Sequence, residues 1–259
     1  MKDISRILVF DLKGYMAHFR KFYTNSSALT YTFPPYTTIT GLIAGILGRQ
    51  RDSYYQEFNH ENCQIAISLM SGSRKIVQTM NYIRTKNKQE FNGSAGPTPT
   101  PLEILLSNEI NLRFRIYFSH SNQQLMETVK ERIQENRYVY PPYLGITEFT
   151  ASLDFIADLK ESEIKQISQE DIAEIDTVIN TDFIKDKGIR LEKTTAGLKI
   201  FKEKMPLEFG ESRRLKKVAS FIFDANGQNI PVILTVPYYQ IQITGGQENI
   251  LFLNQEGGF

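Results

Sequence analysis

Residues 10–48 read FDLKGYMAHFRKFYTNSSALTYTFPPYTTITGLIAGILG, and this stretch sets the start of the fold. The apolar run 7–12, closed by Gly14, is typical of a short β-strand. Pro34-Pro35 excludes helix at that point, because the residue before a proline is pushed toward extended geometry. We therefore predict a helix over 39–47. One of three threonines is expected to cap it: Thr37, Thr38 or Thr40.

A basic and aromatic loop connects the predicted strand to this helix. It contains His18, Phe19, Arg20 and Lys21, with Tyr23 close behind. Aromatic side chains stack on bases, and Arg and Lys neutralise phosphates, so the loop is a candidate site for a nucleotide chain. A solvated loop with one buried aromatic ring is the alternative interpretation. The helix has a small-residue face suited to close packing: Gly41, Ala44, Gly45 and Gly48.

The overall charge is not typical of a nucleic-acid-binding protein. The 259 residues carry 30 basic and 29 acidic side chains, a formal charge of +1, whereas such domains are usually clearly basic. The charges are segregated, however. Residues 158–176 hold seven acidic side chains, while 74–88 and 213–217 hold five and four basic side chains and no acidic one. Basic strips and an acidic face are compatible with a subunit of a larger assembly.

Several classes of protein are disfavoured. Cys63 is the only cysteine, so no intrachain disulfide can form, and with no signal peptide at the N-terminus we expect a cytoplasmic protein. The apolar runs are too short to cross a membrane, so we predict no membrane partner. Three scattered histidines have no zinc-ligand spacing, and the glycine-rich motifs of nucleotide-binding folds are missing. We predict no metal and no cofactor.

The order of elements suggests the fold class. Strands are predicted over 63–70, 76–83, 110–118 and 151–157, with an amphipathic helix over 122–137. With the first strand and helix, this is an α+β fold of the ferredoxin-like, RNA-recognition type, with an insertion between its second and third strands. Alternation of Leu112, Phe114, Ile116 and Phe118 with polar residues predicts that one face of the third strand is buried.

The insertion spans about 84–109 and has a Gly-Pro-rich tip that excludes regular helix. A basic arm (Arg84, Lys86, Lys88) and an apolar arm (102–106) flank this tip. Domain one is predicted to cover 1–157, and a β-rich part packed on it 158–259, with the acidic stretch as boundary. Strands of the second part are predicted at 177–184, 197–204, 218–224, 230–237 and 250–253.

Three motifs together resemble the fifth CRISPR-associated protein family, of the repeat-associated RNA-binding superfamily, in its type I-B-like form. The first comprises Gly14, Ala17, Phe19 and Arg20, then Phe33, Pro34, Pro35, Thr38, Gly41, Leu42, Ala44, Ile46, Leu47 and Gly48. The second is Tyr143–Phe149, which is similar to the family's "Y-L-G-x-x-E-F" element. The third is Pro206–Phe209 with Arg213, Arg214, Val218 and Phe221. All three follow the family's order and span most of the chain.

The resemblance implies a non-catalytic subunit of a type I CRISPR Cascade surveillance complex, acting in antiviral defence. Such a subunit binds the 5′ handle of the guide RNA and caps the backbone filament. Its partners would be the guide RNA, the first backbone subunit and the large subunit, with target DNA as a further neighbour. The Gly-Pro-rich insertion would be the family's thumb, a β-hairpin that kinks the guide RNA and reaches the neighbouring subunit.

We predict RNA contacts from the motif-matching loop, the insertion, a turn glycine and a basic pair that opens a strand. The residues are His18, Phe19, Arg20, Lys21, Tyr23, Arg84, Lys86, Lys88, Gly145, Arg213 and Arg214. For Gly145 the plain alternative is a turn that needs a permissive backbone. For Arg213 and Arg214 it is a solvated face.

A metal-independent endoribonuclease that processes the precursor guide RNA is the alternative function. One subtype of the family cleaves RNA with a Tyr and an adjacent Lys and His, but this chain has no Lys-His pair. His18 near Arg20, with Tyr36 as a phenol, could imitate such a site. His60 and His120 are the other histidines. We predict no catalytic residue, and a ferredoxin-like scaffold without an RNA role is the third possibility.

Overall fold

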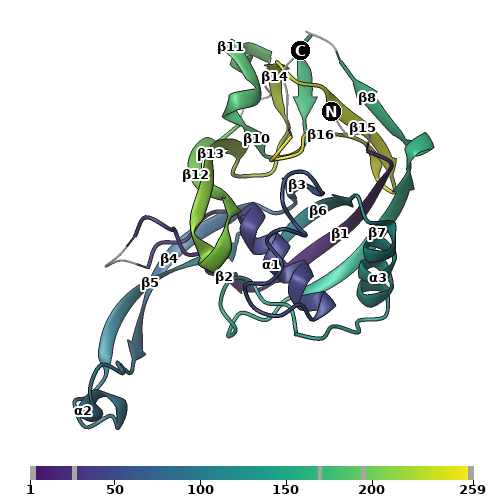
Figure 1. Ribbon diagram of the computed structural model, residues 1–259. Helices are drawn as coiled ribbons and strands as arrows, with labels where there is room; N and C mark the ends of the chain where they lie inside the picture. The colour runs from purple at the N-terminus through teal and green to yellow at the C-terminus, as the bar shows by residue number, and fades with distance from the viewer. Residues whose placement is uncertain (1–3, 25–27, 169–170, 194–196, 256–259) are drawn as a thin grey trace.

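A four-stranded antiparallel sheet forms the centre of the N-terminal part (Figure 1). The computed structural model describes residues 4–24, 28–168, 171–193 and 197–255. The sheet has the order β3-β6-β1-β7. Its strands are β1 (Arg6–Gly14), β3 (Cys63–Leu69), β6 (Leu112–His120) and β7 (Ser152–Lys160). The predicted strands at these places are therefore present, and together they make one sheet.

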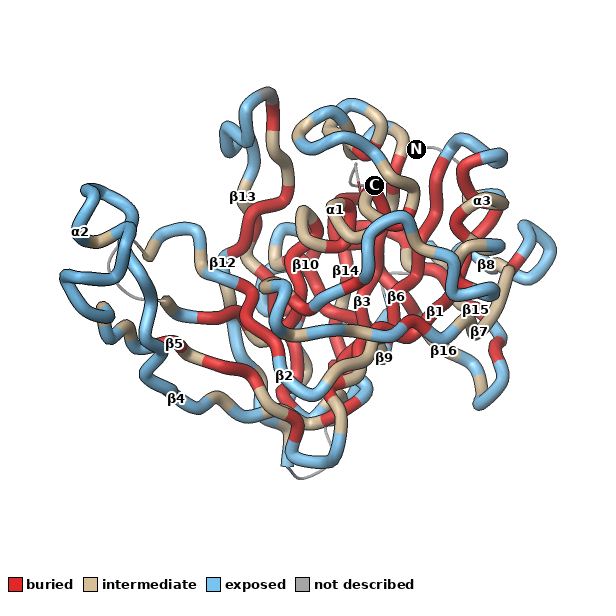
Figure 2. The backbone as a smooth tube through the Cα atoms, turned by 90° about the horizontal axis from the view of Figure 1, so that it is seen from below, coloured by how far each residue is buried: buried red, intermediate tan, exposed pale blue. Residues whose placement is uncertain are grey.

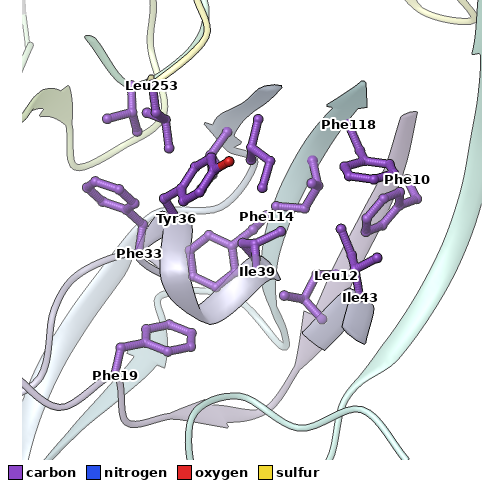
Figure 3. Close-up of a cluster of buried hydrophobic side chains, with 14 of the residues drawn as sticks. Phe10, Leu12, Phe19, Phe33, Tyr36, Ile39, Ile43, Phe114, Phe118 and Leu253 are labelled. Atoms are coloured by element: carbon purple, nitrogen blue, oxygen red, sulfur yellow. The ribbon is translucent and has the colours of Figure 1, made fainter. Parts of the chain in front are cut away.

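Two helices pack against one face of this sheet: α1 (Tyr36–Leu47) and α3 (Gln123–Gln134). Alternate residues of β1 and β6, such as Phe10 and Phe114, are buried beneath them (Figure 3). The predicted alternation in β6 is confirmed, because Leu112, Phe114, Ile116 and Phe118 all belong to this core. Among the described residues, no helix is both long and apolar enough to cross a bilayer.

Helix α1 begins three residues earlier than predicted, and no threonine caps it. The N-cap residue is Pro35, whose carbonyl accepts hydrogen bonds from the backbone of Thr38 and Ile39, at 2.9 and 3.1 Å. The restricted φ of proline suits a helix entry, so the chain turns directly into helix after it. The threonines therefore lie inside the first turns. At the other end, Gly48 has a left-handed backbone with φ 76°.

A long hairpin projects from the sheet and ends in the short helix α2 (Lys88–Phe91) (Figures 1 and 2). Its strands β4 (Ser73–Tyr82) and β5 (Thr98–Ser107) pair along their full length, and β2 (Met16–Ala17) pairs with the base of β5. The predicted insertion limits were too narrow, because β4 forms the first arm. The basic residues expected along that arm lie at the tip instead. Pro99 and Pro101 are tolerated because this part of β5 pairs only with β4.

A second layer covers the other face of the central sheet. It consists of β8 (Ile164–Ile167), β15 (Tyr238–Ile243) and β16 (Gly246–Ile250). Ile7 and Tyr117 on the central sheet pack with Tyr239 of β15 and with Phe252, which follows β16. The acidic stretch predicted as the boundary contributes β8 and also β9 (Ala173–Ile175). Glu170 of that stretch lies outside the described residues.

The remaining strands complete the C-terminal part. One sheet has the order β10 (Ile179–Asn180), β13 (Leu215–Asp224) and β12 (Ile200–Phe209). Another has the order β11 (Ile184–Ile189), β14 (Ile230–Leu234) and β9. Short 3₁₀ helices lie at Glu161–Glu163, Thr181–Phe183, Leu191–Lys193 and Glu211–Arg213. The predicted strand at 177–184 is mostly replaced by β10 and a 3₁₀ turn, and β15 was not predicted. Phe221 and Phe223 pack on Phe33, so both parts share one core.

A buried ionic network ties the central sheet to β16. Asp11, on β1, accepts hydrogen bonds from the Nε atoms of Arg113 and Arg115 at 2.7 and 3.0 Å. Arg115 also donates to Glu248 on β16 at 2.8 Å, and the Tyr117 hydroxyl donates to the same carboxylate at 2.5 Å. Burial alone would lower the pKa of Arg115, but Asp11 and Glu248 outweigh it and raise that pKa. The network therefore joins β1, β6 and β16 through hydrogen-bonded side chains.

Candidate nucleic-acid interface

A groove of about 1040 Å³ lies where the N-terminal loop, helix α1, the outer part of the β4–β5 hairpin and the β12–β13 turn meet. Five segments contribute to its walls. They are the loop at 18–20, the small-residue face of α1 with the residues after it, Tyr82 of β4 with Thr100 and Leu102 of β5, the loop at 140–146, and Arg213. Segments that are far apart in the sequence thus form one continuous surface.

The small face of α1 forms one wall of the groove. Thr37 and Thr38 line it in the first turn, and Gly41 and Gly45 line it further along. The backbone N–H groups at the start of a helix attract anions, and the first turn contains no acidic residue that would oppose them. Gly45 lets a ligand approach the helix backbone closely, whereas the Tyr54 hydroxyl lies 3.1 Å from where a β-carbon of Gly41 would be. This wall can therefore receive a negatively charged chain.

Four arginines line the groove: Arg20, Arg49, Arg51 and Arg213. Arg49 makes two hydrogen bonds to Glu57, at 2.8 and 2.7 Å. Arg213 donates to Asp52 at 2.7 Å, and Arg51 lies 3.5 Å from the same carboxylate. Arg20 donates to the Thr24 carbonyl at 3.3 Å and has no carboxylate partner among the described residues. The arginines supply the charge that a phosphate backbone needs.

Four tyrosines accompany the arginines: Tyr54, Tyr82, Tyr140 and Tyr143. Tyr82, Tyr140 and Tyr143 are exposed, while Tyr54 packs against Tyr55 with ring centroids 4.9 Å apart. Burial raises the pKa of Tyr54, so its hydroxyl stays neutral. Exposed aromatic faces beside arginines provide stacking platforms for unpaired bases. Charge and aromatic surface therefore occur together in the groove.

Two residues of the predicted loop are buried rather than presented to a ligand. The Phe19 side chain is only 2% exposed, and its ring meets that of Phe114 edge-on at 6.0 Å (Figure 3). This ring is not available for stacking on a base. His18 is also buried, and its Nδ1 lies 2.7 Å from the carbonyl oxygen of Glu103. Burial and the nearby Arg20 lower the pKa of His18.

Lys21 and Tyr23 lie beyond the groove. The Lys21 ammonium is 3.1 Å from a carboxylate oxygen of Glu203 and 5.5 Å from the Tyr31 ring centroid. Burial alone would lower the pKa of Lys21, but Glu203 outweighs it and raises that pKa. The charge of Lys21 is therefore already compensated, unlike that of Arg20. Tyr23 is exposed and packs edge-on against Phe22 at 5.3 Å.

Gly145 joins two walls of the groove. Its backbone is left-handed, with φ +90°. A β-carbon at this position would overlap the His18 carbonyl oxygen and lie 2.7 Å from the carbonyl carbon. The neighbouring Leu144 carbonyl accepts a hydrogen bond from the His18 N–H at 3.0 Å. Gly145 is thus required for the close approach of the 143–146 loop to the basic loop.

The other predicted contacts are separated from the groove or lie at its margin. Arg84, Lys86 and Lys88 are exposed around α2 at the hairpin tip (Figures 1 and 2). Arg214 is exposed next to Arg213. The predicted contacts did not include Arg49, Arg51, Tyr54, Tyr82, Tyr140 and Tyr143. A usable signal existed for four of them, because Arg49, Arg51 and Tyr54 come soon after the motif that ends at Gly48, and Tyr143 opens the second motif.

Three residues considered for catalysis, Tyr36, His60 and His120, do not line the groove. Tyr36 is buried, its hydroxyl donates to the carbonyls of Phe58 and Cys63 at 3.1 Å, and burial raises its pKa well above the ordinary value (Figure 3). His60 lies 3.2 Å from Glu208, and His120 lies 2.8 Å from the Glu57 carbonyl. Over the described part of the chain, His, Cys, Asp and Glu residues form no group of three that could hold a metal ion.

Comparisons with known proteins relate the chain to CRISPR systems. Residues 7–163 match the family model described as CRISPR-associated protein (Cas_Cas5). A CRISPR protein from Archaeoglobus fulgidus has a similar fold, with a TM-score of 0.53, 14% identity, and 95% of this chain and 98% of that chain covered. A chain of a CRISPR RNA-guided surveillance complex also has a similar fold, with a TM-score of 0.52 and 14% identity. The alignment covers 87% of this chain and 91% of that chain. No curated protein sequence matches. The matched residues include α1, the hairpin and Gly145, but not Arg213.

Proposed function

The chain belongs to the CRISPR-associated Cas5 family, and from this premise we propose that it holds the 5′ handle of a guide RNA in the groove beside α1. The observation that carries the proposal is the groove itself. It unites Arg20, Arg213, the start of α1 and exposed tyrosines in one surface. A similar fold occurs in a CRISPR RNA-guided surveillance complex, which supports a place in a Cascade-type assembly.

The groove can hold an RNA end through three kinds of contact. Phosphates would lie against the arginines and the first turn of α1, where N–H groups and the helix dipole favour negative charge. Unpaired bases would stack on Tyr140, Tyr143 or Tyr82. These contacts position an RNA end, while base pairing by the guide reads the target sequence.

The fold supports the assignment of the N-terminal part to the ferredoxin-like class. The element order β1-α1-β3-β6-α3-β7 and the sheet order β7-β1-β6-β3 support it. We assign the β4–β5 hairpin as a thumb that reaches a neighbouring backbone subunit, with the large subunit as a second partner. Its exposed apolar side chains favour such contacts, for example Val77 at 67% and Phe91 at 72% exposure.

Loss of two groove arginines is expected to weaken guide-RNA binding. Charge-assisted hydrogen bonds are worth about 1.5–3 kcal/mol, and each 1.4 kcal/mol is about tenfold in affinity. Solvent exposure reduces this, so Arg20→Ala combined with Arg213→Ala should weaken binding by about tenfold or more. The slope of log affinity against log salt should fall by about 0.7 for each lost phosphate contact. Fluorescence anisotropy with repeat RNA over a KCl series measures both quantities.

A control variant removes two positive charges elsewhere. Lys160 pairs with Asp158 at 3.1 Å, and Lys165 is exposed on β8 beside the second layer. Lys160→Ala with Lys165→Ala should bind RNA like the wild type. If this variant loses affinity while the groove variant keeps it, the RNA-binding face is on the other side of the molecule.

We also propose that the subunit does not cleave RNA. The buried hydroxyl of Tyr36 and the buried imidazole of His18 support this. Tyr36 does not line the groove, and His18, although it lines the groove, is only 3% exposed, with its Nδ1 2.7 Å from the Glu103 carbonyl oxygen. The purified chain is expected to leave a repeat RNA hairpin intact, with or without divalent metal, on a denaturing gel. Site-specific cleavage that disappears in His18→Ala or His120→Ala would contradict this and favour the endoribonuclease.

A further inference from the structure

The arginines of the groove are not equally available to a ligand. Arg49 is held by Glu57, and Arg51 and Arg213 share Asp52, whereas Arg20 has no carboxylate partner among the residues described. Both carboxylates come from the short segment 52–57, which lies a few residues after α1 and its C-cap Gly48. In the RNA-free chain, the positive charge of three groove arginines is therefore compensated from within the protein.

Asp52 pairs with both Arg51 and Arg213, and these pairs are more exposed to solvent than the Arg49–Glu57 pair. Its Oδ1 accepts hydrogen bonds from the Tyr55 hydroxyl at 2.5 Å and from Arg213 Nε at 2.7 Å, and its Oδ2 lies 3.5 Å from Arg51 Nε. Hydrogen bonds from Tyr55 and Arg213 lower the pKa of Asp52, so it is ionised at neutral pH. One carboxylate thus faces two arginines that line the groove.

The backbone around this pair is unusual. Asp52 has φ 63°, and its partner Arg213 has φ 59° next to Ser212 with φ 54°. Non-glycine residues in the left-handed region are uncommon and concentrate at functional sites. Two separate segments therefore adopt this conformation where the carboxylate and the guanidinium meet.

The Asp52–Arg213 pair is suited to exchange with a phosphate. The side chains are 32% and 53% exposed, and ion pairs in contact with water contribute little to stability. A phosphate oxygen can accept the same N–H groups, and binding of a nucleic acid releases counterions. The Asp11 carboxylate, by contrast, is fully buried.

We propose that Asp52 is a counter-charge that guide-RNA phosphate must displace from Arg213 and Arg51, and that it thereby makes the groove selective. This inference rests on the proposed guide-RNA binding. A polyanion that meets only the arginines must compete with Asp52. An RNA end that also fills the α1 wall and stacks on the tyrosines offsets that competition. The carboxylate therefore lowers the affinity for unrelated RNA more than the affinity for the guide-RNA end.

The test is the variant Asp52→Asn in the full chain. Asparagine keeps the shape and an oxygen that can accept hydrogen bonds, tolerates a left-handed backbone, and removes the negative charge. Affinities for repeat RNA and for oligouridine of the same length are measured by fluorescence anisotropy over a KCl series. We expect oligouridine to bind about three- to tenfold tighter, which corresponds to about one freed charge contact. Its salt slope should steepen by about 0.7 per added phosphate contact. Repeat RNA should gain less.

Two further variants complete the design. Asp52→Gly also removes the charge and suits a positive φ. Like Asp52→Asn, it should therefore reduce the difference in affinity between repeat RNA and oligouridine. Asp154→Asn makes the same chemical change at an aspartate that pairs with Lys13 outside the groove, and it should leave both affinities at wild-type values. A thermal melt of each variant confirms that it is folded.

The outcomes separate this inference from the proposed function. Unchanged oligouridine affinity and salt slope in both Asp52 variants overturn the inference, and so does weaker binding of both RNAs, which would make Asp52 a residue that positions Arg213. If the wild type binds repeat RNA and the Arg20/Arg213 double variant loses it, the proposed function stands whatever Asp52 does. A wild-type chain that binds neither RNA overturns both.

Discussion

Replacing Gly145 with alanine is expected to lower the free energy of unfolding by about 3 kcal/mol or more. Few single substitutions destabilise a protein this much, and steric overlap with backbone strain is one of the causes. The added methyl group would overlap the carbonyl oxygen of His18, and φ at this position is +90°. His18 cannot move aside easily, because its backbone N–H is bonded to Leu144 and its ring to the Glu103 carbonyl. Urea unfolding measures the loss, and the RNA affinity should fall with it because two groove walls separate.

Gly45→Ala is the matched control for this change. It adds the same methyl group on another wall of the groove, where the nearest atom, Cβ of Tyr140, would be 3.9 Å away. Alanine inside a helix is more favourable than glycine by about 0.5–1 kcal/mol, so stability should hold or rise. If Gly145→Ala melts like the wild type, the 143–146 loop can shift, and the close approach to His18 is not required.

Replacing Asp11 with asparagine is expected to destabilise the protein by about 3–5 kcal/mol, because it leaves a buried guanidinium without its main counter-charge. Asp11 is fully buried, and it accepts hydrogen bonds from two arginines. Glu248 on β16 remains close to Arg115 but lies on the opposite layer. The variant should therefore also loosen the second layer, which hydrogen exchange of the β16 amides would detect alongside urea unfolding.

Asp154→Asn provides the comparison for Asp11. It neutralises an aspartate on the same sheet, but this one forms an exposed pair with Lys13. Exposed pairs contribute about 0–1 kcal/mol, so little change is expected. Equal stabilities of the Asp11 and Asp154 variants would mean that the buried network contributes no more than a surface pair.

Much of the N-terminal fold could be predicted from local patterns. The alternation in Leu112–Phe118, the small-residue helix after Pro35 and the glycines at 48 and 145 each report a constraint within a few neighbouring residues. Strand periodicity tells which face is buried, and a proline tells where a helix can begin. The basic loop around Arg20 was likewise recognisable, and the structure places Arg20 in the groove.

The composition of the candidate site depended on contacts between distant segments. Arg20 and Lys21 are adjacent and chemically alike, yet Lys21 is neutralised by Glu203, which is 182 positions away in the chain. Phe19 is drawn into the core by Phe114, and Arg213 is brought to α1 by the β12–β13 turn. Local periodicity carries no information about which distant carboxylate or ring will meet a side chain. The burial and pairing that separate a free cation from a compensated one arise only when the segments pack together.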